Sequence, residues 1–338
     1  MMKKNAENKN TKYSPINTKN LGILIFVLLI YLLIYFVVSQ DLLLRQYRSI
    51  LVLTAVNIIL AVSLNLVTGF LGELSLGHAG FMMIGAYAGA LFTKYIESSS
   101  INLPVPILII LAVIVGGLFA ALAGILIGIP VLRLTGDYLA IVTLAFGEIV
   151  RSISENLEIT NGAAGLSGIT SYTNYKNFSY SYIIMIITIV IISNLINSKQ
   201  GRAILSVREN HIAAESIGIN LPRFRLLAFT LGAFFAGIAG VVHAHNQGTL
   251  FPSEAGYNKS IDLLVIVVLG GMGNIKGSII AAIVLTIIPE LLRDAADYRQ
   301  LLYSIVLIIL MLTSSNEKIA AFRNRIFGKL SISQKKGE

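Results

Sequence analysis

The most constraining feature of this sequence is a series of long apolar runs that contain no charged residue. Three of them are Leu21 to Val38, Ile50 to Phe70 and Leu103 to Leu132. Each is long enough for an α-helix to cross the hydrocarbon core of a membrane, which takes roughly 18–20 residues. Backbone groups in lipid must be satisfied within their own segment, and no alternating strand pattern is present. The chain is therefore predicted to be an all-α, polytopic membrane helix bundle.

The composition supports the same class. Charged residues make up 13% of the 338 positions, about half the usual share of about 25% in soluble domains. The net charge of +9 comes from basic patches that flank apolar runs, such as Lys199 to Arg225. These patches lack the interleaved aromatic residues of single-strand binders, so nucleic acid is not a predicted partner and the lipid bilayer is. Cysteine is absent, which excludes disulfides and thiolate metal sites.

About ten apolar segments can be separated by their polar boundaries. They run near 21–38, 50–68, 76–93, 104–129, 138–150, 180–197, 224–245, 261–275, 277–292 and 300–314. The segments 138–150, 261–275 and 277–292 are too short to cross the membrane unaided, so they are predicted half-helices that lie within protein or line a cavity. The bundle is thus expected to contain eight to ten spanning or half-spanning helices.

The distribution of basic residues predicts the orientation of these segments. With a cytoplasmic N-terminus, 18 of the 26 lysines and arginines fall on the inside and the other eight outside. Because basic residues are enriched in cytoplasmic loops, both termini are expected in the cytoplasm. The predicted regions are a basic cytoplasmic N-terminus (1–20), a transmembrane domain (21–315) with a cytoplasmic loop (198–223), and a basic cytoplasmic tail (316–338).

Small residues recur at four-residue spacing in two of the segments. Gly116, Ala120, Gly124 and Gly128 form one such stripe, and Gly85 with Gly89 begins another. Stripes of this kind let neighbouring backbones approach closely, so they predict tight helix packing. Repetition is otherwise weak, with a faint echo between the glycine-rich stretches 69–89 and 270–282.

The motifs of nucleotide and metal enzymes are absent from the chain. There is no G-x-x-x-x-G-K-[ST] phosphate loop and no H-E-x-x-H motif. His243 and His245 are two residues apart, a spacing that points them in different directions on a helix, so interfacial residues are favoured over metal ligands. The chain is therefore not expected to be an enzyme or to bind a cofactor itself.

Three ionisable residues lie in or beside apolar segments: Glu73, His78 and Glu148. Such residues are costly in a membrane and usually face a pathway or a polar partner. The structural alternatives are a buried pair or a helix-end residue for Glu73, and a helical ion pair with Arg151 for Glu148.

Glycine-rich turns supply a second kind of pathway candidate. The stretches 69–80 and 161–168 expose backbone amide and carbonyl groups that can bind the polar groups of a solute transiently. Simple tight turns between helices are the alternative. The residues that we predict to line a translocation pathway are Asn65, Ser75, His78, Glu148, Asn161 and Gly162.

The polar loop between the sixth and seventh apolar segments carries the most information about partners. Residues Arg208 to Ile217 are expected to form one short amphipathic helix that stops at Gly218. Its apolar face, with Ile212 and Ile217, can seat in a partner's groove. A loop helix lying on the membrane surface is the alternative from these residues alone.

This loop resembles the EAA-type coupling loop of bacterial ABC importer permeases, in the form Glu-x-x-x-Ala-Ala-Glu-Ser-x-Gly over 209–218. Two further stretches, 64–87 and 130–149, resemble the LivM-type permease of branched-chain amino-acid ABC importers. They read LNLVTG-x-x-GELSLGHAGF and PVLRL-x-GDYLAIVTL, and Val268 to Asn274 matches as well. The resemblance covers roughly residues 50 to 315. Within the loop, the sequence differs from the E-A-A-x-x-x-G form of the motif.

The resemblance implies a permease of the bacterial cytoplasmic membrane that imports leucine, isoleucine and valine. Its implied partners are two ABC ATPase subunits that use the ATP, a homologous second permease, and an extracytoplasmic substrate-binding protein. The residues implied in coupling to the ATPases are Arg208, Glu209, Asn210, Ala213, Ala214, Glu215 and Gly218.

Two rival functions remain open from the sequence. One keeps the architecture and imports urea, short amides or another small polar solute. The other is a self-sufficient secondary transporter or channel, which would work without ATP and without partner subunits.

Overall fold

A computed structural model describes residues 18–40, 48–99, 103–134 and 136–291, together with 304, 305 and 308. The tenth apolar segment, 300–314, and the basic tail lie almost entirely outside these described residues. The chain divides into two compact units, residues 1–45 and 46–338. In the first unit, α1 (Thr18–Ser39) is an uninterrupted helix of 22 residues, which gives it a length of about 33 Å.

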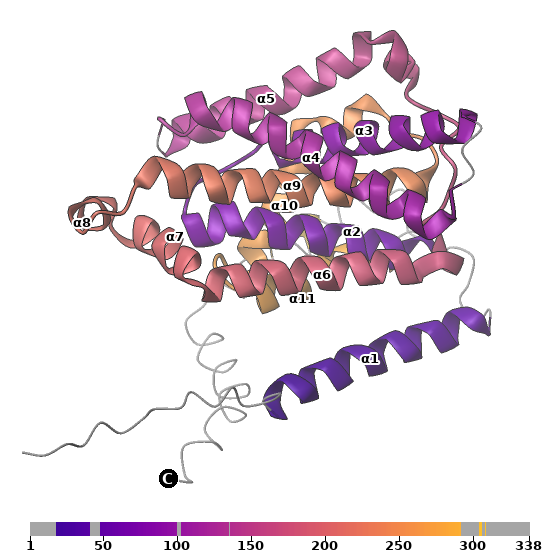
Figure 1. Ribbon diagram of the computed structural model, residues 1–338, viewed down its shortest axis with the longest axis horizontal. Coiled ribbons are helices and arrows are strands. Elements are labelled where there is room, and N and C mark those ends of the chain that lie inside the picture. The colour runs from indigo at the N-terminus through magenta and orange to yellow at the C-terminus, as the bar shows by residue number, and fades with distance from the viewer. Residues whose placement is uncertain are drawn as a thin grey trace, which may run out of the picture. The chain divides into compact units, whose positions relative to one another are not determined.

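The second unit is a helical bundle (Figure 1). Its helices in chain order are α2 (Arg48–Asn65), α3 (His78–Ser98), α4 (Val105–Val131), α5 (Asp137–Asn156), α6 (Phe178–Asn197), α7 (Lys199–Glu209), α8 (His211–Ser216), α9 (Leu221–Gln247), α10 (Tyr257–Gly270) and α11 (Ile275–Leu291). A π-helical segment, η2 (Leu66–Leu71), continues α2. Among the described residues, extended pairing is limited to an isolated bridge between Leu166 and Leu250.

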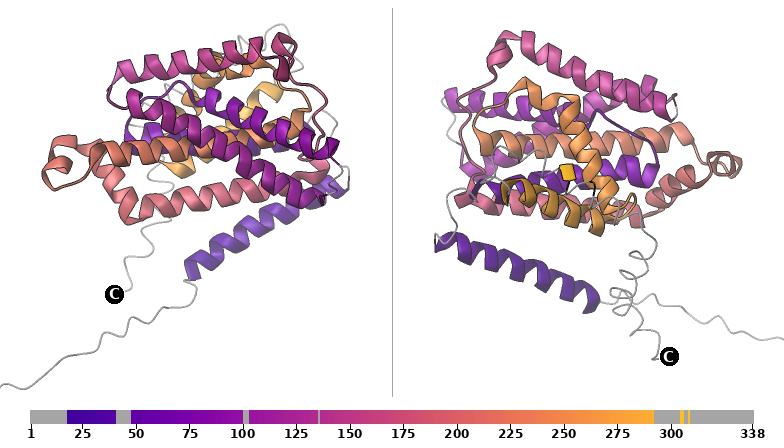
Figure 2. Two further views of the ribbon diagram at one scale, coloured as in Figure 1. Left: turned by 45° about the horizontal axis from the view of Figure 1, so that its top comes forward. Right: turned by 180° about the vertical axis from the view of Figure 1, so that it is seen from behind.

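Helix α9 forms the centre of the bundle and is buried over almost its whole second half. Figure 2 shows it surrounded by α2, α3 and α4. The predicted small-residue stripes meet there: Gly85 of α3 packs against Gly237 of α9, and Gly116 of α4 lies against Gly85 and Val241. Because glycine has no side chain, these three backbones approach closely, and the packing prediction is confirmed.

The outer helices present apolar side chains outward. Leu126 of α4 is 72% exposed, and Ile183 and Ile187 of α6 are also exposed. Among the described residues, four helical stretches are long and apolar enough to cross a membrane by length and composition: Ile50–Leu71, Val105–Val131, Tyr175–Asn197 and Leu221–Gln247. An apolar exterior around a small-residue interior is the arrangement expected of a bundle whose solvent is lipid.

The predicted short segments have different outcomes. Helices α10 and α11 have 14 and 17 residues and are separated by a turn at Gly271. At about 1.5 Å per residue, α10 is about 21 Å long, well short of a hydrocarbon core of about 30 Å. The segment predicted at 138–150 is longer than expected, since α5 runs for 20 residues. Its polar end stays helical because Arg151 pairs with Glu148 and Glu155, one turn away on either side.

A break in the helical backbone follows α2. Residues 72–77 are non-helical and run from the end of η2, beside the start of α9, to the start of α3 in the bundle interior. Leu76 donates its backbone N–H to Thr143 Oγ1 of α5 at 3.0 Å. Non-helical backbone is tolerated in a membrane protein where other protein groups satisfy it or where it lines a cavity.

Candidate coupling loop and translocation pathway

The loop of residues 198–223, here called the coupling loop, contains two helices rather than one. Helix α7 ends at Glu209, Asn210 adopts an extended conformation, and α8 begins at His211. The Asn210 side chain accepts a hydrogen bond from Ala213 N at 3.0 Å and so caps α8. The predicted continuous helix over 208–217 is therefore wrong, because asparagine favours an N-cap over a helix interior.

The predicted stop at Gly218 is confirmed. Gly218 has a φ of +85°, a conformation that residues with a side chain rarely adopt. Its N–H binds Glu215 O at 2.9 Å, and Ile219 N binds Ala214 O at 3.1 Å. These bonds satisfy the last carbonyls of α8 in the manner of a Schellman-type end. The side chain of Asn220 then caps α9 by accepting from Arg223 N.

Helix α8 lies at the outer end of the bundle (Figure 1) and exposes its branched apolar residues. Ile212 is 67% exposed and Ile217 is 76% exposed, whereas Ala214 is buried on the opposite side. The neighbouring Glu209, Ala213 and Glu215 are also exposed. Exposed isoleucines beside charged groups form the kind of surface that enters a partner's groove.

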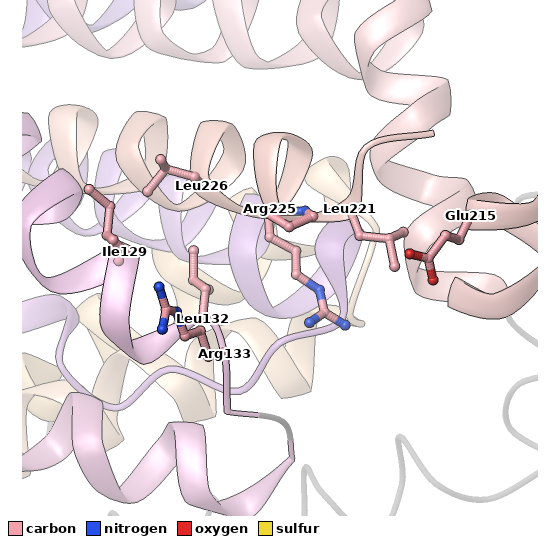
Figure 3. Close-up of a pocket in the computed structure, with 9 residues that line it drawn as sticks. Ile129, Leu132, Arg133, Glu215, Leu221, Arg225 and Leu226 are labelled. Carbon is pink, nitrogen blue, oxygen red and sulfur yellow. The ribbon is translucent and has the colours of Figure 1, made fainter. Parts of the chain in front are cut away.

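A cleft of about 450 Å³ lies beside the coupling loop (Figure 3). It is bounded by the end of α4, by α8 and by the start of α9. Leu132, Leu221 and Leu226 contribute apolar surface, and Arg133 and Glu215 contribute charge. The cleft separates the end of α4 from Glu215 of α8.

Glu73 is paired with Arg225 near the same cleft. The two side chains are 10% and 16% exposed, and Arg225 Nε lies 3.2 Å from Glu73 Oε1. Glu73 follows the span that ends at Leu71; burial raises the pKa of its carboxyl group, against the opposing effect of Arg225 and His211. The structural alternative for Glu73, a buried pair, is therefore the arrangement observed.

Replacing Glu73 by glutamine should destabilise the chain, because Arg225 would lose its counter-ion in a largely buried position. Breaking a buried pair costs about 3–5 kcal/mol. Because burial already disfavours the charged form of Glu73 and both side chains keep some exposure, the expected cost lies below that range. Thermal unfolding of the purified protein in detergent measures the change. Glu155→Gln, which removes one partner of the more exposed Arg151 on α5, is the matched control and should leave the midpoint unchanged. Equal midpoints for both variants would contradict a stabilising role for the buried pair.

Three of the predicted pathway residues lie around the junction of α2, α3, α5 and α10. His78 Nε2 is 2.8 Å from Ser63 Oγ of α2, and Glu148 Oε1 accepts from Tyr257 N at the start of α10. The hydroxyl of Ser75 is buried and has no hydrogen-bond partner among the described residues. The start of α3 meets α10 here as well, because Ala79 N donates to Ser260 Oγ at 3.2 Å.

Glu148 also makes the helical ion pair that the sequence offered as an alternative. Its Oε2 lies 3.1 Å from Arg151 Nη1, and Arg151 Nε binds Glu155 at 2.9 Å. One carboxylate thus holds the N-terminus of the short helix α10 and a basic residue of α5. Negative charge at a helix N-terminus is favourable, so Glu148 contributes to placing α10.

The other predicted pathway residues lie elsewhere. Asn65 is fully buried at the C-terminal end of α2, two residues after Ser63, and its amide bonds to Ser278 of α11 and to the turn between α10 and α11. Asn161 and Gly162 belong to the loop between α5 and α6, within tight 3-10 turns. Asn161 has a φ of +62° and donates to Gly165 O at 3.3 Å, as expected of a turn residue. The structure therefore does not bring these two residues to the α3–α10 junction.

The structure adds residues that sequence reasoning missed. Ser63 and Ser260 supply the hydroxyl groups at the α3–α10 junction, and Gly273 contacts Asn65. A serine within an apolar helix is common, so no sequence pattern selected Ser63 or Ser260 as site residues. Gly273 belongs to the stretch Val268 to Asn274 that matched the family, but that match did not indicate its contacts with Asn65 and Gly69.

Broken helices in an apolar bundle, with an exposed loop helix at one end, define a polytopic membrane permease. Residues 46–314 match the model of the family described as the permease component of the branched-chain amino acid transport system. The chain belongs to this family of branched-chain amino acid permease components.

Similar proteins carry related names. The high-affinity branched-chain amino acid transport system permease proteins LivM of Escherichia coli and of Salmonella typhimurium are each 35% identical, over 87% of this chain and 74% of their own length. The Escherichia coli permease protein LivH of the high-affinity branched-chain amino acid transport system is 32% identical over 34% of this chain and 38% of its own. No solved structure matches this chain.

Proposed function

We propose that this chain is a permease subunit of an ATP-driven importer that moves branched-chain amino acids across the bacterial cytoplasmic membrane. The observation that carries the proposal is the exposed helix α8, with Ile212 and Ile217 outward, on a bundle of this permease family. An ATPase subunit binds α8 in a groove on its surface and hydrolyses the ATP. The chain itself contributes the coupling loop, which transmits the movement of the ATPase, and part of the translocation pathway.

The proposal also includes a second permease, two ATPase subunits and a binding protein. LivM and LivH are both named as permease proteins of one transport system, and this chain is similar to each. A second, homologous permease therefore pairs with this chain, two ATPase subunits bind the pair, and an extracytoplasmic binding protein delivers the substrate. A pathway must release what it binds, so high affinity belongs to the binding protein.

The proposed pathway passes the α3–α10 junction. Ser75, His78 and Glu148 supply polar groups there, and broken helices expose backbone groups that an amino acid's carboxylate and ammonium can contact. The alternating exposure of this junction to the two sides would follow from movement of the coupling loop.

Reconstitution tests the function. The chain is co-expressed with its neighbouring genes, and the purified complex is placed in proteoliposomes with the binding protein. Uptake of labelled leucine, isoleucine or valine should require both ATP and the binding protein. Labelled urea and a short amide are the comparison solutes, and preferential uptake of either would move the assignment to that substrate. Uptake by this chain alone under an ion gradient would contradict the proposal.

A further inference from the structure

Arg208 lies in the last turn of α7; the residue is exposed as a whole, but its guanidinium bonds to the end of α2 within the same chain. Its Nη1 donates to Gly69 O of the π-helical segment η2 at 2.7 Å. Ile204 and Val207 of the same helix are buried and pack α7 onto the bundle. Arg208 is thus a polar link between the coupling loop and the end of α2, formed across 139 residues of sequence.

Three glycines form the slot that holds this side chain: Gly69, Gly72 and Gly273, here called the glycine slot. A Cβ atom on Gly72 would lie 2.8 Å from Arg208 Cγ, and one on Gly273 would lie 3.0 Å from its Nη1. Gly72 and Gly273 also have φ values of +83° and +80°. Side chains at these positions would strain the backbone and force the arginine side chain to shift.

The slot connects two separate breaks in the helical backbone. Asn65 accepts from Gly273 N at 2.8 Å and donates to Ser278 Oγ at 2.8 Å, so it ties the end of α2 to the α10–α11 turn. Gly69 makes this possible, because a Cβ atom there would overlap the Asn65 side chain and Gly273 N. Arg208 therefore contacts η2 directly and lies against the α10–α11 turn.

The local backbone is suited to transmit movement. π-Helical segments are rare and mark sites where a helix is adapted for function. The positive guanidinium lies at the carbonyl end of α2 and η2, where a cation is favoured by the helix dipole. A charge-assisted bond to a backbone carbonyl holds this end in one arrangement, and its loss would free Gly69.

We propose that Arg208 is a positioning residue that transmits movement of α7 and α8 to η2 and the α10–α11 turn through the glycine slot. The inference rests on the proposed function, in which a partner moves α8. In this proposal Arg208 acts through its bond to Gly69 of the permease itself, whereas Ile212 and Ile217 form the surface that faces the ATPase.

The test uses the complete importer complex in proteoliposomes with Arg208→Gln. Loss of the charged donor should lower the amount of amino acid transported per ATP hydrolysed by about tenfold, at normal complex yield. Arg208→Lys should restore part of the ratio, because an ammonium reaches one carbonyl but does not fill the slot. The matched control is Arg202→Gln on the same helix, whose exposed side chain bonds only to Asn197 O at 3.3 Å; it should keep the wild-type ratio.

Hydrogen exchange supplies a readout that needs no transported substrate. On adding ATP, wild-type complexes should change amide exchange in α8, in residues 66–72 and in residues 271–277. Arg208→Gln complexes should keep the change in α8 and lose the other two. If the wild-type complex moves no branched-chain amino acid but this pattern is seen, the substrate assignment fails and the coupling role of Arg208 stands.

Two outcomes would overturn the inference. One is an Arg208→Gln complex with the wild-type ratio and the wild-type exchange response. The other is a reduced yield of complex whose surviving fraction keeps the wild-type ratio, because Arg208 would then serve folding alone.

Discussion

Replacing Ile212 and Ile217 of α8 by aspartate is expected to abolish ATP-dependent uptake, a loss of at least about a hundredfold. Both side chains are exposed in the isolated chain, so the change should leave folding and membrane insertion intact. Two buried apolar anchors in a partner groove contribute roughly 1.5–3 kcal/mol each, and two carboxylates there would oppose binding. Co-purification of the ATPase subunits, measured beside uptake, reports the effect directly.

The matched control keeps the shape of the surface. Ile212→Val with Ile217→Val should retain the ATPase subunits and most of the uptake. Gly218→Pro should also abolish ATP-dependent uptake by disrupting the end of α8. Proline cannot adopt the φ of +85° and lacks the N–H that binds Glu215 O. Uptake at the wild-type rate by the double aspartate variant, with normal complex yield, would rule out α8 as the docking element.

Gly240→Leu should prevent the chain from accumulating in the membrane as a folded protein. A Cβ atom on Gly240 of α9 would overlap Met82 O of α3 and approach Ala86 N to 2.9 Å. Because both of these atoms belong to the backbone of α3, helices α3 and α9 would have to separate. Overpacking of a tight core costs about 1–3 kcal/mol, and separation of two backbones exceeds that range. Yield and size-exclusion profile in mild detergent measure the outcome.

Ala121→Leu is the comparison variant for this packing test. Ala121 lies on α4 next to the buried stripe but is itself partly exposed, whereas Gly240 is buried. The variant should accumulate normally and elute as the wild-type protein does. Similar losses for Gly240→Leu and Ala121→Leu would show that bulk anywhere on these helices is harmful, and would contradict the close α3–α9 contact as the cause.

The coupling loop shows where sequence patterns succeed and where they fail. The stop at Gly218 was predictable, because a glycine after a periodic segment indicates a left-handed helix end. The break at Asn210 was not, since asparagine is tolerated in helices and caps them only when its side chain finds a backbone N–H. The helix α5 was underestimated for a similar reason: the charged residues that seemed to end it are paired with one another.

The pathway residues show the same division. Their types marked Glu73, His78 and Glu148 as costly in a membrane, yet their partners lie far away in sequence: Arg225, Ser63 and the N-terminus of α10. Asn161 and Gly162 were chosen because glycine-rich turns expose backbone groups, and the structure shows the alternative, tight turns between helices. The sequence pattern indicates that a polar residue is energetically costly in a membrane. Only the contacts in the structure show which partner groups offset that cost.

The long uncharged runs of the sequence by themselves determined that this chain is a membrane helix bundle, because lipid leaves the backbone no other partner than its own segment. The four-residue spacing of glycine and alanine likewise predicted close helix contacts. Only the tertiary structure showed that Arg208 bonds to Gly69 and that Asn65 joins two broken helices. These bonds connect residues more than a hundred positions apart, and they depend on directed polar contacts that no local periodicity records.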